Sequence, residues 1–277
     1  MMRRLSSVLL RALAWGAVAV TLFPVGWIVL TSIKPAEISQ ALPPIWQFTP
    51  TLRNYADVLT GNTYTSQVFG GLLLHSAVIT VSATLLALLT GVPAGYSLAR
   101  LKFPGRRFTA MWVLSTIMFP PAVSVIPIFI IASRLGLMDT LPVLVVPYAA
   151  FGLPMVIWMV RSYVRQIPYE IEEAAMVDGA SQGALLRRIV LPLLMPGIAA
   201  AALLTAMLAW NEFLFALTLT RSVVKTAPVG ISEFTSMYGT QWGDLTAAAT
   251  VTVAPILVLT LILRRRLVEG LTFGAVK

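Results

Sequence analysis

The sequence of 277 residues contains no cysteine and a single histidine, His75. The missing cysteines exclude disulfide bonds, thiol catalysis and cysteine-based metal sites, and a lone histidine excludes a metal site built from several. Charged residues are also scarce, at 11% of the chain against about a quarter in an ordinary soluble domain, whereas 58% are hydrophobic. This composition indicates an integral membrane protein without a separate soluble domain.

Motifs for catalysis are missing as well. No G-x-x-x-x-G-K-[ST] loop is present to bind nucleotide phosphates, and neither a carboxylate pair nor a serine–histidine–acid arrangement has a recognisable context. The sequence therefore predicts a protein that is not an enzyme, with no cofactor and no metal bound by this chain. Uphill transport by such a protein needs an energy-supplying partner or an ion gradient, so an ion-coupled secondary transporter is the alternative interpretation.

Six apolar segments are long enough to cross a membrane, because a spanning helix needs roughly 20 apolar residues. They cover about residues 12–32, 73–98, 108–132, 141–160, 195–219 and 246–263. Prolines interrupt most of them, and small residues as in "TGVPAGYSLA" permit close helix contacts. These features fit either a tightly packed bundle or one that rocks and lines a polar pathway. We predict an all-α integral membrane protein of six transmembrane helices, in a single domain over residues 1–277.

Basic residues set the predicted orientation. With the N-terminus inside, only Lys34, Arg53, Arg134, Arg221 and Lys225 fall on the outer side, and the other fifteen lysines and arginines fall inside. This asymmetry predicts that both termini are cytoplasmic. The formal net charge of +9 then reflects topology and anionic headgroups, and we expect no nucleic-acid partner.

The longest predicted outer segment, about 33–71, contains the stretch "TLRNYADVLTG". Its apolar residues Leu52, Tyr55, Ala56 and Leu59 recur at helical spacing, and the pattern stops at a glycine. The stretch predicts a short helix that lies on the outer surface.

Three polar residues in or near the spans are candidates for a substrate pathway. Glu212 is the one acid clearly inside a predicted span, where an ionisable group is a functional candidate. It either hydrogen-bonds a neighbouring helix or subunit, lines the pathway with Asn211, or relays protons. His75, at the start of the second span, is either an interfacial histidine with its hydrogen bonds satisfied or a substrate contact.

A polar stretch over about 169–194 falls between the fourth and fifth predicted spans, on the cytoplasmic side. Pro168 suits the first turn of a helix, and Asp178-Gly179 suits its end because glycine tolerates a left-handed backbone. Ser181 is a candidate N-cap for a second helix. The stretch therefore predicts a helix, a sharp turn and another helix.

The first of these helices presents a candidate docking face. Ile167, Ile171, Ala174 and Ala175 share one side, and the two alanines make it flat enough for another surface to approach closely. The acids nearby disfavour an anionic inner leaflet as the partner surface. A protein partner with basic groups fits better.

The residues here carry a resemblance. Glu173-Ala174-Ala175, Gly179, Ile189 and Leu191-Pro192 match the pattern EAA-x3-G-x9-I-x-LP, which resembles the signature of inner-membrane permease subunits of bacterial ABC importers. Further segments resemble the carbohydrate branch, within it the MalG-like permeases of maltose-like and trehalose-like importers. These segments are Asn54-Tyr55, "YSLARLKFPGRR", "LGLMDT", "PYAAFGLP", "WNEFLFAL" and "GLTFGAVK". The chain departs at His75, where such permeases often have asparagine.

The resemblance implies an ABC importer (type I) permease fold, with a core at about residues 70–264 and a cytoplasmic coupling loop at about 165–192. It implies that the chain forms half of a sugar pathway and couples ATP hydrolysis on partner chains to alternating access. The positions that it assigns to ATPase coupling are Glu173, Ala174, Ala175, Asp178, Gly179, Ile189, Leu191 and Pro192.

The implied partners are a second, related permease, two ATPase subunits that bind ATP and Mg, an extracytoplasmic solute-binding protein, the sugar and membrane lipid. The tail after Arg264 is also expected to contact the ATPases. The implied location is the bacterial inner membrane, which the chain crosses several times. Importers of disaccharides, amino sugars, polyols and glycerol phosphate share this subunit type, so the cargo stays open among these classes.

Overall fold

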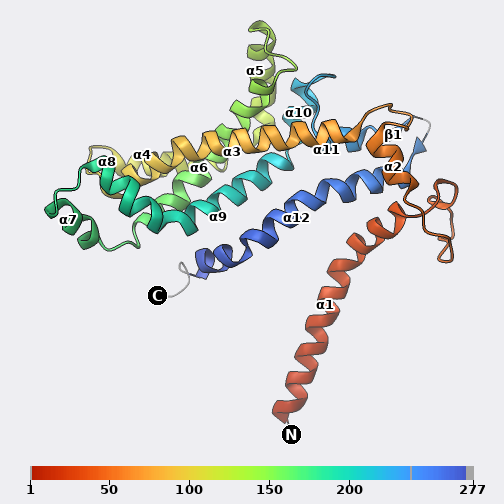
Figure 1. Ribbon diagram of the computed structural model, residues 1–277, viewed down its shortest axis with the longest axis horizontal. Helices are drawn as coiled ribbons and strands as arrows, with labels where there is room; N and C mark the ends of the chain where they lie inside the picture. Colours follow the sequence, from red (N-terminus) through yellow and green to blue (C-terminus); the bar gives the residue numbers. More distant parts are fainter. Residues whose placement is uncertain (1, 238, 273–277) are drawn as a thin grey trace. The chain divides into compact units, whose positions relative to one another are not determined.

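A computed structural model describes residues 2–237 and 239–272 of the chain (Figure 1). Its elements in chain order are α1 (Met2–Ser32), η1 (Ala36–Ile38), α2 (Arg53–Thr60), α3 (Phe69–Arg100), α4 (Arg106–Thr116), α5 (Pro121–Arg134), α6 (Leu141–Val164), α7 (Tyr169–Val177), α8 (Gln182–Leu185), η2 (Leu186–Val190), α9 (Leu191–Trp210), α10 (Leu214–Leu219), α11 (Ala227–Ser232), β1 (Thr235–Ser236), β2 (Gly239–Thr240) and α12 (Trp242–Thr272). Here η1 is a 3-10 turn and η2 a π-helical turn. The two strands form one antiparallel pair.

The chain divides into two compact units, Met1–Leu72 with Val229–Pro255 and Leu73–Pro228 with Ile256–Lys277. The single domain predicted from the sequence stays a prediction. The end of the tail, for which the sequence predicts a cytoplasmic position and contact with ATPases, lies at 273–277, outside the described residues.

The all-α prediction is confirmed: the described residues contain five helices long and apolar enough to cross a membrane, and a sixth span if α4 and α5 count as one. That third span is broken: α4 and α5 meet at 90° (Figure 1). The break falls at Pro120-Pro121, because proline fixes its backbone and lacks the N–H that a continuous helix needs. The sequence analysis did not predict this corner.

The fifth span differs from its predicted range of 195–219. The candidate span runs over Gln182–Trp210, and a break separates it from the short α10. Pro192 and Pro196 both lie inside this continuous helix, and the π turn η2 comes directly before α9.

Small residues bring the helices of the second unit close together. A Cβ atom added to Gly91 of α3 would lie 2.6 Å from Val156 of α6. One added to Gly95 would lie 2.8 Å from Val160 of α6. The helix α6 also packs against α9, where a Cβ atom added to Gly152 would lie 2.5 Å from Thr205. The close contacts expected from "TGVPAGYSLA" are present, and any larger side chain at these two glycines of α3 collides with α6.

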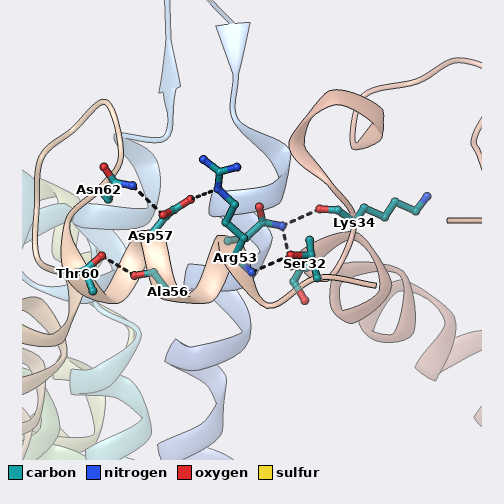
Figure 2. Close-up of polar contacts among 9 residues, drawn as sticks. Ser32, Lys34, Arg53, Ala56, Asp57, Thr60 and Asn62 are labelled. Atoms are coloured by element: carbon teal, nitrogen blue, oxygen red, sulfur yellow. Dashed lines mark hydrogen bonds and ion pairs between the residues drawn. The ribbon is translucent and has the colours of Figure 1, made fainter. Parts of the chain in front are cut away.

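In the first unit, α2 secures the end of α1. The amide of Asn54 donates to the carbonyls of Ser32 and Lys34 at 2.8 Å, so it satisfies backbone groups that the end of α1 leaves free. Figure 2 shows α2 beside these residues, together with the ion pair between Arg53 and Asp57.

The predicted short helix is confirmed, including its end at Gly61 with a φ of 78°. Its inward face differs from the predicted apolar one. Asn54 and Val58 are buried, whereas Leu52 and Leu59 are exposed. The reason is that the polar Asn54 has backbone partners inside the protein.

Candidate coupling site and membrane pathway

The local sequence determines the shape of α7, which begins directly after Pro168. Its end is a Schellman motif: the N–H of Gly179 donates to Met176 O at 3.1 Å and that of Ala180 to Ala175 O at 2.9 Å. The motif needs a left-handed residue, which is the glycine at φ 85°. The predicted helix end is confirmed.

The second helix starts as expected from its N-cap. The hydroxyl of Ser181 accepts from the N–H of Ala184 at 3.3 Å. Arg187 and Arg188 follow on the exposed side of η2, where the π turn interrupts the regular helix. A basic turn thus adjoins the acidic α7 in the chain.

The structure divides the predicted coupling residues into two groups. Exposed on α7 and its end are Glu173, Ala174, Asp178 and Gly179. Ala175 is buried at 8% exposure. The expectation that both alanines form one open face is therefore wrong, because adjacent helical residues point about 100° apart. The remaining members lie around the start of α9: Ile189 and Leu191 are half-buried and Pro192 is exposed.

A buried ion pair that the sequence analysis missed holds the inner side of α7. Glu172, 2% exposed, accepts at Oε1 from Arg100 Nε at 2.6 Å and at Oε2 from the Tyr96 hydroxyl at 2.8 Å. Arg100 also donates to the carbonyl of Ile167 at 2.6 Å. Tyr96 and Arg100 are four residues apart on α3, so they share a helix face. That spacing, inside "YSLAR", was the signal available in the sequence.

Glu212 lies at a structured break between α9 and α10. Its carboxylate accepts from the Tyr148 hydroxyl at 2.7 Å and from the N–H groups of Phe215 and Ala216 at 3.0 and 3.3 Å. The side chain therefore satisfies the free donors at the start of α10. Of the alternatives weighed for Glu212, these contacts match hydrogen bonding to a neighbouring helix.

Glu212 and Tyr148 also line a cavity of about 330 Å³, which is otherwise mostly apolar and includes Phe119 and Phe151. Asn211 is exposed, and its amide donates to Met207 O in its own helix at 2.8 Å. The structure therefore brings only Glu212 of the three pathway candidates to this cavity. Nδ1 of His75 lies 3.2 Å from Lys225 O, which matches a histidine with a satisfied hydrogen bond.

Asp139, also missed from the sequence, anchors the segment that follows α10. Its carboxylate accepts from four successive N–H groups, those of Arg221, Ser222, Val223 and Val224, at 3.0–3.1 Å. Burial acts to raise the pKa of Asp139, but the four backbone hydrogen bonds outweigh it and lower the pKa to about 2. Its own left-handed backbone, at φ 60°, suits aspartate better than most residues.

Within the described ranges 2–237 and 239–272, no three His, Cys, Asp or Glu side chains gather as metal ligands do. What the two regions offer is an exposed helix edge at α7 and a small polar–apolar cavity at Glu212. Neither has the arrangement of a catalytic centre.

Comparison with known proteins identifies the chain's family. Residues 91–272 match the model of the binding-protein-dependent transport system inner membrane component. The trehalose transport system permease protein SugB of Mycobacterium tuberculosis is 39% identical over 266 residues, covering 94% of each chain. The trehalose/maltose transport system permease protein MalG of Thermococcus litoralis is 36% identical, over 93% of this chain and 92% of the relative.

A solved structure has the same fold. It is a bacterial ABC transporter involved in the import of the acidic polysaccharide alginate, with a TM-score of 0.77 and 23% identity, covering 95% of this chain and 96% of its own. The predicted family and its permease fold are confirmed. The chain thus belongs to the binding-protein-dependent ABC transport permeases, as a multi-pass, non-catalytic subunit of the inner membrane.

Proposed function

We propose that this permease forms half of a sugar pathway and couples ATP hydrolysis on two partner ATPase subunits to alternating access. The other half comes from a second, related permease, and an extracytoplasmic solute-binding protein delivers the sugar. ATP and Mg bind to the ATPases. The core at about 70–264 carries the pathway, and the loop at about 165–192 carries the coupling.

The exposed edge of α7 is the observation that carries the proposal. Glu173 and Ala174 lie on it at their positions in the coupling pattern, and Gly179 ends the helix sharply after it. An acid beside a small side chain suits a cleft that contains a basic group, since the alanine permits a close approach. In this arrangement Ala175, which points inward, supports the edge and does not contact the ATPase.

The proposal that the cargo is a sugar is based on the substrates for which related permeases are named. Those at 32–39% identity include permeases named for trehalose, for trehalose and maltose, and for diacetylchitobiose, the last from Streptomyces coelicolor. The Glu212 cavity, with tyrosine, phenylalanine and a carboxylate in its wall, has side chains suited to a sugar surface. We place the cargo among small oligosaccharides, and ligand affinities of the cognate solute-binding protein will identify it.

Purification tests the coupling proposal. The permease, co-expressed with its ATPase and second permease, is expected to yield a complex whose ATPase is stimulated by the loaded binding protein. Ala174→Asp should remove the ATPase from a correctly inserted permease, because it adds charge and bulk to the exposed edge. Ala175→Asp should reduce the amount of folded permease itself, since it buries a carboxylate.

Glu170→Gln is the matched control, because Glu170 is an exposed acid of the same helix outside the coupling pattern. It should assemble and transport normally. A lone permease with ion-dependent uptake would refute the proposal, as would an Ala174→Asp complex that keeps its ATPase and its uptake.

A further inference from the structure

The contact between α7 and α3 is polar, buried and specific. Arg100 is the last residue of α3. Its guanidinium donates to the carboxylate of Glu172 on α7 and to the carbonyl of Ile167 just before α7, both at 2.6 Å. Its guanidinium also lies 5.5 Å from the ring centre of Tyr169. One side chain thus contacts Ile167 just before α7 and Tyr169 and Glu172 in its first half.

The pair is shielded from solvent on both sides. The side chain of Arg100 is 12% exposed and that of Glu172 is 2% exposed. A buried ion pair contributes little net stability, because desolvation offsets its attraction, but it strongly disfavours any arrangement in which the partners separate. The contact therefore fixes geometry more than it adds stability.

The remaining surroundings of α7 are less restrictive. It also packs against α8, the next element along the chain, to which the Asp178-Gly179 turn connects it. The edge with Glu173 and Ala174 points outward. A force applied to that edge would tilt α7 about its turn unless its other side were attached to a long helix.

We propose that Arg100 is a positioning residue that locks α7 to α3, so that a displacement of α7 moves α3 with it. The inference rests on the proposed docking of α7 to an ATPase. In this arrangement Glu173 and Ala174 receive the push, and Glu172, the adjacent acid on the inner side, passes it to α3. The two neighbouring glutamates, one buried and one exposed, thus have different roles.

The absence of cysteine permits a direct test. Cysteines are introduced at the exposed Leu101, just after α3, and at the exposed Val177, the last residue of α7. Spin labels at the two positions report the distribution of distances between the helices in the assembled transporter, provided that the labelled parent still transports. Sugar uptake per ATP hydrolysed is measured on the same preparations.

Arg100→Gln and Glu172→Gln are expected to retain the ATPase subunits, at least double the width of the distance distribution and lower the uptake per ATP at least tenfold. Arg100→Lys keeps the charge without the forked geometry and should fall between these variants and the parent. Glu170→Gln should change neither measurement. A purely structural role for the pair would lower the yield of complex without changing its uptake per ATP.

Wild-type distance widths and coupling ratios in both Gln variants would overturn the inference. If those variants fail to assemble, Arg100→Lys decides the question, and a wild-type ratio in its assembled complex overturns the inference. Failure of the proposed function has a different signature, because the unmodified permease would then not purify with an ATPase chain.

Discussion

Two short helices, α2 and α7, are built alike and held differently. Each has eight or nine residues and ends at a glycine with a left-handed backbone, Gly61 or Gly179. Each also takes part in an ion pair. The α2 pair joins Arg53 to Asp57 within one helix, and its arginine side chain is 77% exposed. The α7 pair joins Glu172 to Arg100 of another helix, 72 residues away, and is buried.

The difference shows how the surroundings determine what an ion pair does. The α2 pair is screened by water and stabilises only its own helix turn. Other contacts hold α2 to the rest of its unit, among them the neutral amide of Asn54. In α7 the charged pair itself makes the long-range connection. The following predictions rank these contacts by their effect on the free energy of unfolding.

The largest effect is expected at the buried pair. Arg100→Leu should lower the free energy of unfolding by about 3–5 kcal/mol, because it leaves the carboxylate of Glu172 buried without its counter-charge. Denaturation of the purified complex in detergent, followed by tryptophan fluorescence, measures the loss. A loss below about 1 kcal/mol would mean that this pair behaves like an exposed one.

Asp139 tests whether backbone donors can replace an arginine. Asp139→Ala should lower the free energy of unfolding by about 2 kcal/mol or more, since four N–H groups lose a charged acceptor. Because the pKa of Asp139 is lowered from 3.8 to about 2, its contribution is present above pH 4 and is lost as the pH falls through about 2. Unfolding of parent and variant between pH 5 and pH 2 should show the difference between them shrinking with acidity. A constant difference would assign the effect to packing and to the left-handed backbone, which alanine disfavours.

The two glycines separate backbone strain from crowding. Gly61→Ala and Gly179→Ala both force alanine into a left-handed backbone, which should lower the free energy of unfolding by about 1 kcal/mol each. Gly61→Ala should cost more, because its Cβ would lie 3.2 Å from Val68 Cγ2, whereas the Cβ at Gly179 meets no atom within 4 Å. Thermal unfolding of the two variants side by side gives the order. Equal losses would show that strain alone decides.

Glu212 is a carboxylate held, like Glu172, by a tyrosine hydroxyl, with backbone N–H groups in the place of an arginine. Glu212→Gln should therefore cost only about 1 kcal/mol, since the amide oxygen can still accept these bonds. Uptake in reconstituted vesicles should be preserved. Loss of uptake in a fully assembled complex would instead point to a role for the charge in the pathway.

The smallest effect is expected at the exposed pair. Asp57→Asn should change the free energy of unfolding by no more than about 0.5 kcal/mol, and raising the salt concentration should shrink that change further. The same unfolding assay at low and high salt checks both statements. If Asp57→Asn instead lowers the free energy of unfolding by several kcal/mol at any salt concentration, the exposed ion pair of α2 behaves like the buried pair of α7.

Features encoded by neighbouring residues were predictable from the sequence. Pro168, Gly179 and Ser181 act on the backbone within a few residues, so the beginning and end of α7 and the start of α8 follow from local chemistry. The same is true of the end of α2 at Gly61. The coupling pattern and the family resemblance depend on these positions, and the family was identified correctly.

Features that depend on distant partners were not predictable. The burial of Ala175 depends on tertiary packing, and the pairing of Glu172 follows from where α3 lies, which no local pattern reveals. The end of α9 at Trp210 carries no proline or glycine signal, because the break is made by Glu212 with Tyr148 of another helix. The 90° corner at Pro120-Pro121 had a signal, but an apolar run of spanning length concealed it.

The π turn η2 lets the chain lose one residue without disturbing the helix that follows. A π turn contains one residue more than the α-helical turn into which it can relax. Deleting one residue between Leu186 and Val190 should therefore leave the faces of α9 in place. The same deletion inside α9 would rotate the following side chains by about 100° and misalign them against α6. The junction between the coupling segment and the membrane helix can thus lose one residue without rotating α9.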